Sequence, residues 1–191
     1  MNLAIFGGTF DPIHTAHLEA ARAASAALQL DRVLFIPAAV SPFKAGITTT
    51  PFEHRLRMVQ LAIAGEPGFE ASDIEAGTAR SYSIDTVEKL EQGPANGARL
   101  FFIIGADAFA EIRGWHRWQD LTAKVEFIVV SRPGHEYEIP PGVRVHRLDS
   151  LSLNVSSTQA RRDIATTGWA PHLQADVLAY INEHGLYASR S

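Results

Sequence analysis

Cysteine is absent from the 191-residue sequence. Its absence excludes a disulfide framework, a thiolate metal site and a thiol nucleophile, and it fits a reducing compartment without proving one. Strong charge of either sign is also missing, because the net charge is −4 and the pI is near 6.0. Bulk binding of nucleic acid needs a basic surface, so we expect no nucleic-acid partner and only locally placed cations for a small anionic ligand.

Long hydrophobic runs are missing as well. The N-terminal MNLAIFGG is much shorter than the apolar region of a signal peptide and lacks a basic flank, and no other stretch approaches a membrane span. We therefore expect a cytoplasmic protein with no membrane partner. The length is that of one α/β domain, or of one domain with a small appendage, and the 46% hydrophobic content predicts an ordinary buried core. We expect a single domain over residues 1–191, with a helical C-terminal part at about 152–191. Oligomeric state stays open between a monomer and a homodimer.

Short apolar runs alternate with helical patterns along the chain. We expect strands at 3–6, 32–37, 69–74, 100–104, 125–131 and 143–148, and helices at 14–30, 53–64, 83–91, 157–166 and 172–184. The proline-containing segments 38–51 and 132–142 are interpreted as mobile, lid-like loops. This alternation predicts an α/β fold with a doubly wound parallel sheet and C-terminal helices. Ligands of such sheets bind at the carboxyl ends of the strands, so the segments after the strands are the candidates for chemistry.

The first strand runs into the sequence GGTFDPIHTAHL at residues 7–18. Gly7 and Gly8 allow close approach of the backbone to a ligand, and Thr9 adds a hydroxyl donor. His14 and His17 are three residues apart at the start of a helix and so share a face. The free N–H groups and the dipole of a helix N-terminus favour anions. The motif therefore predicts a site for phosphate oxygens.

Other interpretations of this motif stay open. A His-x-x-His pair can bind a metal ion, although zinc needs three or four ligands and no third is evident nearby. The two histidines could also lie on the surface without a function. We interpret Asp11 and Pro12 as structural residues that set the turn and the entry into the helix.

A second candidate phosphate site is the run SSTQAR at residues 156–161. The hydroxyls of Ser156, Ser157 and Thr158 open a helix and can supply capping oxygens beside free amides. Arg161 lies one turn further and could reach the same anion with its planar guanidinium. An ordinary capped helix with a surface arginine is the alternative.

The first run resembles the His-x-Gly-His signature of the nucleotidyltransferase superfamily. The longer string GGTFDPIH resembles the adenylyltransferases that act on nicotinate mononucleotide or phosphopantetheine. The second run resembles their Ser-Ser-Thr-x-(Ile/Val)-Arg motif, which implies that it holds the β- and γ-phosphates of ATP. Two positions depart from these patterns, with Ala16 in place of glycine and Ala160 in place of a branched aliphatic residue. We expect both changes to leave the phosphate donors in place.

Segments in the middle of the chain separate the two acceptors. The runs RSYSIDT (80–86), IIGAD (103–107), WHRW (115–118), SRPG (131–134) and HGLY (184–187) resemble the nicotinate-nucleotide adenylyltransferases, over nearly the whole chain. Phosphopantetheine adenylyltransferases share the phosphate motifs but are shorter and lack this middle set. The resemblance implies a Rossmann-like nucleotidyltransferase fold and transfer of an adenylyl group from ATP to nicotinate mononucleotide.

Side chains of these segments suit an aromatic, anionic acceptor. Trp115 can stack on a pyridine ring. The resemblance implies that Ser83 and backbone amides near Ile84 and His116 bind the ring carboxylate. Asp107 follows a strand and could accept from ribose hydroxyls or belong to a magnesium shell. Trp118 is interpreted as a core residue, and Asp85 and Glu88 as a solvated helix face.

Two loop residues complete the expected acceptor site. Lys44 and Arg132 lie in the two loops interpreted as mobile and could close on the acceptor phosphate. A histidine usually precedes that lysine in the family, whereas here the residue is Phe43. A polar contact to phosphate from position 43 is therefore not expected.

The expected reaction depends on positioning and charge stabilisation. The acceptor phosphate attacks the α-phosphorus of ATP in line, without a covalent enzyme intermediate. Four residues are expected to be catalytic: His14, His17, Lys44 and Arg161. Mg²⁺ is expected as the cofactor, bound through the phosphates of ATP rather than directly by the protein. The expected ATP-binding set is Gly7, Gly8, Thr9, Phe10, His14, His17, Gly105, Asp107, Ser156, Ser157, Thr158 and Arg161. A phosphopantetheine adenylyltransferase and a non-catalytic nucleotide sensor are the alternatives.

Overall fold

The computed structural model describes residues 1–40, 49–93, 95–131, 134–149 and 155–188. Six strands form one sheet in the order β3-β2-β1-β4-β5-β6, and each neighbouring pair is parallel. The strands are β1 (Asn2–Gly8), β2 (Arg32–Pro37), β3 (Phe69–Ala71), β4 (Arg99–Gly105), β5 (Glu126–Ser131) and β6 (Val145–Asp149). The predicted doubly wound parallel sheet is confirmed.

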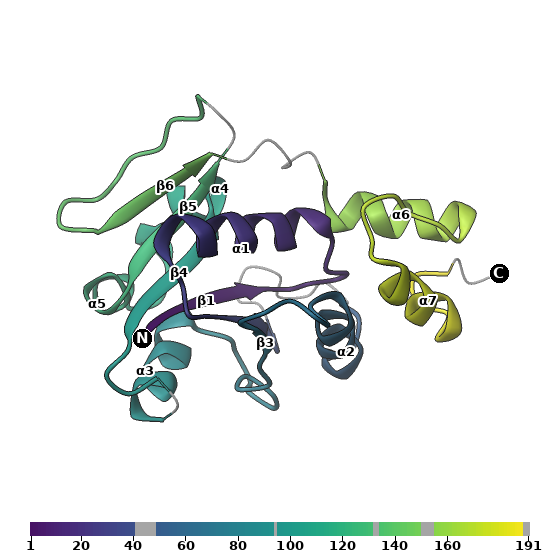
Figure 1. The fold of residues 1–191 in the computed structure, drawn as a ribbon, viewed down its shortest axis with the longest axis horizontal. Coiled ribbons are helices and arrows are strands. Elements are labelled where there is room, and N and C mark those ends of the chain that lie inside the picture. The colour runs from purple at the N-terminus through teal and green to yellow at the C-terminus, as the bar shows by residue number, and fades with distance from the viewer. Residues whose placement is uncertain (41–48, 94, 132–133, 150–154, 189–191) are drawn as a thin grey trace.

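Helices cover both faces of the sheet, which is why its central strands are apolar on both sides. The helices of the first half are α1 (Thr15–Leu28), α2 (Phe52–Ala62) and α3 (Ser83–Gln92). Those of the second half are α4 (Ala106–Ala110), α5 (Trp118–Lys124), α6 (Ser157–Thr167) and α7 (Ala175–Glu183), with a 3₁₀ turn η2 (Ile112–Gly114). Figure 1 shows α6 and α7 together beyond one end of the sheet.

Two hydrophobic cores flank the sheet because alternate residues of each strand point to opposite faces. In β1, Ala4 and Phe6 pack with residues of α1, α2, α6 and α7, whereas Leu3 and Ile5 pack with α3, α4 and α5. Ile5 lies between Leu34 of β2 and Phe102 of β4 at the centre of the sheet. Full burial of such a side chain contributes about 2 kcal/mol, so this centre holds the site rigidly.

Several boundaries differ from those expected. The first helix begins at Thr15 rather than at residue 14, and the last begins at Ala175 rather than at residue 172. The third strand has only three residues, Phe69–Ala71. The third helix begins at Ser83, and Tyr82 is its capping residue. The short elements α4, η2 and α5 were not predicted, because each is too short to show a hydrophobic period.

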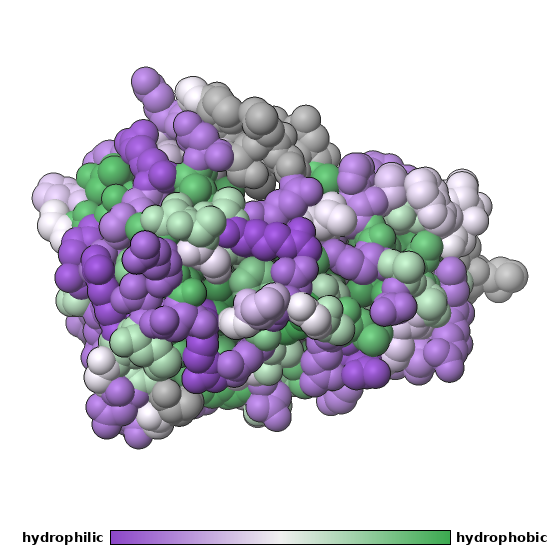
Figure 2. Space-filling model, viewed as in Figure 1, coloured by the Kyte–Doolittle hydropathy of each residue, from purple (hydrophilic) through white to green (hydrophobic). Residues whose placement is uncertain are grey.

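The chain reverses its winding direction between β1 and β4, which lie side by side at the middle of the sheet. A crevice opens at the carboxyl ends of two such strands, where their connections leave in opposite directions. The glycines at the ends of β1 and β4 lie at this point. On the face drawn in Figure 2, polar and apolar residues are interspersed. Within the described ranges, no helix has the length and apolar character that crossing a bilayer requires.

Candidate active site

A pocket of about 220 Å³ lies at the carboxyl ends of β1 and β4. Its lining includes six of the residues expected to contact ligands: Gly7, Gly8, Thr9, Ser83, Gly105 and Trp115. These residues come from four separate parts of the chain, and the fold brings them together at one point. The pocket therefore joins the glycine turn expected to contact ATP with the serine and tryptophan expected to contact the acceptor.

Packing of one aromatic ring explains the second glycine of the turn. A Cβ atom on Gly8 would lie 3.1 Å from the ring of Phe10, which is tighter than an ordinary contact. Phe10 itself has a positive φ of 48° and is buried, with its ring 5.1 Å from that of His17. The ring of Phe10 thus supports His17 from the core. A contact of Phe10 with ATP stays a prediction for its backbone alone.

His14 and His17 lie together at the start of α1, as expected. Their rings are stacked with centroids 3.8 Å apart. His14 is the capping residue, and its backbone N–H donates to His17 Nδ1 (3.2 Å). Because His17 accepts at Nδ1, its ring proton must lie on Nε2, so the opposite edge of the ring is a hydrogen-bond donor.

Both imidazoles are neutral near pH 7. Burial, together with the neighbouring His172, lowers the pKa of His14 to about 4. Burial also lowers the pKa of His17 well below its usual value, and the adjacent His14 acts in the same direction. His14 is 6% exposed and therefore does not lie on the surface, and a role of the two histidines in phosphate binding stays a prediction. Phosphate oxygens near these rings would raise their pKa values, which favours anion binding at lower pH.

The start of α6 packs directly against the glycine-turn segment. Arg161 Nη1 donates to the Asp11 carbonyl oxygen (2.7 Å), and Ser157 Oγ donates to the Pro12 carbonyl oxygen (2.9 Å). Ser156 caps α6 by accepting from the backbone N–H of Gln159 (3.1 Å). The two motifs are about 150 positions apart in the sequence, yet they adjoin in space. The proximity that a shared triphosphate site requires is thus present.

The two departures from the family pattern are accommodated by packing. Ala16 lies in the first turn of α1 and Ala160 in α6, and both are buried, Ala160 in the core that α1, α2, α6 and α7 share. A methyl group fits in each place, so neither alanine alters the backbone of the motif. The expectation that these changes leave the phosphate donors in place agrees with this geometry.

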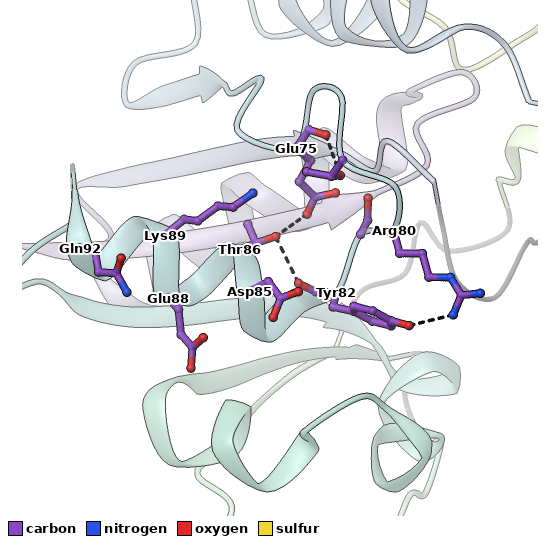
Figure 3. A pocket seen from close by; sticks show the side chains of 10 residues that line it. Glu75, Arg80, Tyr82, Asp85, Thr86, Glu88, Lys89 and Gln92 are labelled. Atoms are coloured by element: carbon purple, nitrogen blue, oxygen red, sulfur yellow. Dashed lines mark hydrogen bonds between the residues drawn. The ribbon is translucent and has the colours of Figure 1, made fainter.

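The start of α3 lies on the side of the pocket expected to take the acceptor. Figure 3 shows a neighbouring pocket of about 360 Å³ beside this helix, which shares Glu75 and Ser81 with the 220 Å³ pocket. Glu75 Oε1 accepts from Thr86 Oγ1 (2.6 Å), and Ser81 Oγ accepts from the backbone N–H of Ala39 (2.9 Å). These contacts fix α3 against the end of β2. Glu75 is 8% exposed and lines the pocket, although it was not among the expected residues. Ser83 and Ile84 supply first-turn amides, which a helix leaves unpaired.

Trp115 is half-buried at the edge of the pocket, with its indole 6.1 Å from the Phe102 ring in an edge-to-face arrangement. His116 is exposed, with its ring 4.3 Å from the Tyr82 ring and tilted by 33° to it, and it does not line the 220 Å³ pocket. Trp118 was expected in the core but is only half-buried. The helix face of Asp85 and Glu88 is not purely solvated, since Arg117 contacts both of their carboxylates.

A second cavity of about 440 Å³ adjoins the first and shares Gly105 and Ala108 with it. Asp107 lines this cavity, with its side chain fully exposed and 3.7 Å from His135 Nε2. Asp107 therefore lies just after β4, where a carboxylate can accept from sugar hydroxyls as expected. Asp107 was expected to contact both ATP and the acceptor, and its position does not show which of the two it contacts.

Two expected residues, Lys44 and Arg132, and the departure at Phe43 lie outside the described residues. The alternative of a metal site at the paired histidines gains no support: within the described ranges, no group of three or more His, Cys, Asp and Glu residues is placed to hold a metal ion.

Arg55 is a residue that the sequence analysis missed. It is 1% exposed and donates to the carbonyl oxygens of Thr9 (2.8 Å), Thr50 (2.8 Å) and Ala39 (3.4 Å). Burial lowers the pKa of Arg55. The guanidinium thus ties together the segments that follow β1 and β2 and precede α2. Its position three and four residues before Met58 and Val59, on the apolar face of a helix, is the sequence signal for it.

Comparison with known proteins gives consistent matches. A family model described as cytidylyltransferase-like matches residues 5–163. A "probable nicotinate-nucleotide adenylyltransferase" of Solibacter usitatus is 58% identical over 187 residues, covering 98% of this chain and 100% of the relative. A protein of the same name from Pelobacter propionicus is 40% identical over 215 residues, covering 98% and 99%.

Solved structures agree on the fold. The nicotinic acid mononucleotide adenylyltransferase of Plasmodium falciparum, complexed with NaAD, superposes with a TM-score of 0.79 at 20% sequence identity. The match covers 97% of each chain. At this identity the similarity concerns the fold, which is the Rossmann-like arrangement of β3-β2-β1-β4-β5-β6 with C-terminal helices.

Proposed function

The chain belongs to the cytidylyltransferase-like family and, within it, to the nicotinate-nucleotide adenylyltransferases, and on this premise we propose that it transfers the adenylyl group of ATP to nicotinate mononucleotide. The products are nicotinate adenine dinucleotide and pyrophosphate, in the biosynthesis of NAD. The observation that carries the proposal is the convergence of both phosphate motifs on the turn at Asp11 and Pro12, beside the pocket that contains Ser83 and Trp115.

The chemistry needs no nucleophile from the protein. An oxygen of the acceptor phosphate forms the new bond to the α-phosphorus of ATP, and the bond from that phosphorus to the bridging oxygen breaks as pyrophosphate leaves. A phosphate monoester is largely ionised near neutral pH, so no general base is required. The protein contributes orientation and stabilisation of the developing charge.

We assign the phosphate contacts to residues at the two helix starts. His17 donates from Nε2, His14 lies stacked beside it, and Arg161 presents the remaining donors of its guanidinium next to the turn. The hydroxyls of Ser156, Ser157 and Thr158 and the backbone at Gly7, Gly8, Thr9 and Phe10 complete the ATP set, together with Gly105 and Asp107. Lys44 is proposed as the fourth catalytic residue, whose ammonium group contacts the reacting phosphates.

The acceptor is assigned to the α3 side of the pocket. Trp115 stacks on the pyridine ring, and Ser83 with the amide of Ile84 binds its carboxylate at the positive end of the α3 dipole. His116 and Arg132 are proposed to complete the site, with His116 contributing its backbone amide. Exclusion of water from this pocket would strengthen each of these polar contacts.

Magnesium fits the donor set as a partner of the phosphates rather than of the protein. Asp107 offers one fully exposed carboxylate beside the nucleotide strand, which is the number of protein ligands that Mg²⁺ commonly takes at a nucleotide site. The phosphates would hold the ion, which would neutralise the charge of the triphosphate, and Asp107 would contact it only through its water shell. Orientation of the two substrates depends on the side chains already assigned to the phosphates and to the acceptor.

We also infer that residues 1–191 act as one nucleotidyltransferase domain, with its C-terminal helical part at about 152–191. The hydrogen bonds of Arg161 and Ser157 with residues 11 and 12 support this view, because they join the C-terminal part to the glycine-turn segment. A cytoplasmic location and the choice between monomer and homodimer stay predictions.

A panel of acceptors tests the proposal. Pyrophosphate release from ATP is measured with nicotinate mononucleotide, its amide and phosphopantetheine, each over a range of concentrations. We expect the highest kcat/KM with nicotinate mononucleotide. A clear preference for phosphopantetheine would overturn the choice of acceptor, and ATP binding without release with any acceptor would replace the enzyme by a nucleotide sensor.

A further inference from the structure

The carboxylate of Asp11 is enclosed by the protein. Asp11 is 5% exposed, and both of its carboxylate oxygens accept hydrogen bonds. Oδ1 accepts from the Tyr187 hydroxyl (2.6 Å), and Oδ2 accepts from the backbone N–H of Thr50 (3.2 Å). This carboxylate is therefore used to join chain segments rather than to contact a ligand.

The backbone carbonyl of the same residue binds the guanidinium of Arg161. The Asp11 carbonyl oxygen accepts from Arg161 Nη1 at 2.7 Å, whereas the guanidinium's contact with Thr158 Oγ1 is longer, at 3.4 Å. The orientation of the guanidinium thus depends mainly on where the Asp11 carbonyl points. Since the side chain and the carbonyl belong to one residue, the donors that hold the carboxylate also hold the carbonyl.

Tyr187 is suited to act as a fixed donor. It is half-buried near the C-terminus, and its hydroxyl also lies 4.0 Å from Met58 Sδ. Burial and the negative charge of Asp11 raise the pKa of Tyr187, which keeps its phenol protonated. A hydrogen bond from this phenol to a carboxylate is charge-assisted, and its removal leaves a buried carboxylate oxygen without a donor.

We propose that Tyr187 is a positioning residue for the triphosphate site, which acts through Asp11 on the guanidinium of Arg161. The inference rests on the proposed function, because it assigns the anion bound by Arg161 to the triphosphate of ATP. It extends the site to the end of the chain, beyond the motifs that contact substrate. Without the phenol, Asp11 shifts toward another donor, and Arg161 loses its orientation toward the phosphates.

A matched pair of tyrosine variants tests this role. Tyr187→Phe removes only the hydroxyl that Asp11 accepts from. Tyr180→Phe is the control, because its hydroxyl forms a similar bond with His54 Nδ1 (2.8 Å), between α7 and α2. We expect Tyr187→Phe to raise the KM for ATP or lower kcat by about fivefold or more, with the KM for the acceptor little changed. Tyr180→Phe should match the wild type within about twofold.

A second arm tests the route through Arg161. Binding of inorganic triphosphate is measured by calorimetry in the wild type, Tyr187→Phe, Arg161→Lys and the double variant. If Tyr187 acts through Arg161, the two substitutions weaken binding by less together than the product of their separate factors. Triphosphate binding needs no acceptor, so this arm decides the inference even if the acceptor panel overturns the proposed function.

Three outcomes would overturn the inference. One is triphosphate affinity in Tyr187→Phe equal to that of the wild type. Another is full additivity with Arg161→Lys. The last is equal loss of triphosphate affinity in Tyr187→Phe and Tyr180→Phe with equal falls in Tm, which would mean that Tyr187 serves only stability.

Discussion

Replacement of His14 by glutamine tests the electrostatics of the paired imidazoles. His14 is buried, its Nδ1 has no hydrogen-bond partner among the described residues, and its pKa is lowered from 6.5 to about 4. The folded protein therefore binds the proton of this residue more weakly than the unfolded chain does. Unfolding takes up a proton between these two pH values, so acid favours the unfolded state.

The size of the effect follows from the two pKa values. The stability that depends on neutral His14 is complete above pH 6.5, falls as the pH drops toward about 4, and changes no further below that value. The loss across this window is about 3 kcal/mol. His17 adds a loss in the same direction, because burial lowers its pKa too. A fall of this size is a large part of the stability of an ordinary domain.

Urea unfolding at a series of pH values from 7.5 to 4 measures the effect, in steps of about half a unit. We expect a steep loss of stability below pH 6.5 in the wild type and a shallower slope in His14→Gln. The exposed residue His116, changed to glutamine, is the control and should keep the wild-type slope. If His14→Gln lowers the free energy of unfolding by the same amount at every pH, the substitution has changed packing alone. Equal pH slopes in the variant and the wild type would therefore refute the reasoning.

Three further substitutions test the site and its scaffold. His17→Ala should lower kcat by about a hundredfold or more with the far-ultraviolet circular dichroism unchanged, and near-normal turnover would remove His17 from the phosphate site. Arg55→Met should lower the free energy of unfolding in urea by about 3 kcal/mol, because it removes the hydrogen bonds that the buried guanidinium donates to the carbonyls of Thr9 and Thr50, and a change below about 1 kcal/mol would contradict this. Glu126→Gln should cost about 2 kcal/mol at pH 7, because Arg99 and His146 hold the pKa of Glu126 at about 2; this stabilisation is complete above pH 4.5 and should vanish as the pH falls toward 2, whereas a constant difference would exclude linkage.

The sheet and the pocket were predictable because their signals are local. The runs that became β1, β2, β4 and β5 are continuous and apolar, which is the pattern of strands buried on both faces. The glycine turn and the residues after β4 could then be placed at one edge of the sheet. No local signal predicted that residues 11 and 161 lie together. Only the expectation that both motifs bind the phosphates of one ATP molecule required it, and the hydrogen bond between the two residues shows that they do adjoin.

Contacts that join distant segments were not predictable in the same way. In the sequence, Arg55 looks like an ordinary charged residue of a helix. Its role depends on three carbonyl acceptors, from positions 9, 39 and 50, which only the fold brings together. Tyr187 belonged to a recognised motif, but only the fold brings its hydroxyl to Asp11.

The two edges of the sheet restrict how copies of the protein can associate. One edge, β3, is only three residues long, and the other, β6, carries His146, Arg147 and Asp149 within five residues. A very short strand and a charged strand both disfavour pairing with a strand of another molecule. Concentrated solutions should therefore resist growth of intermolecular sheets, and any stable contact between copies would have to use helical faces.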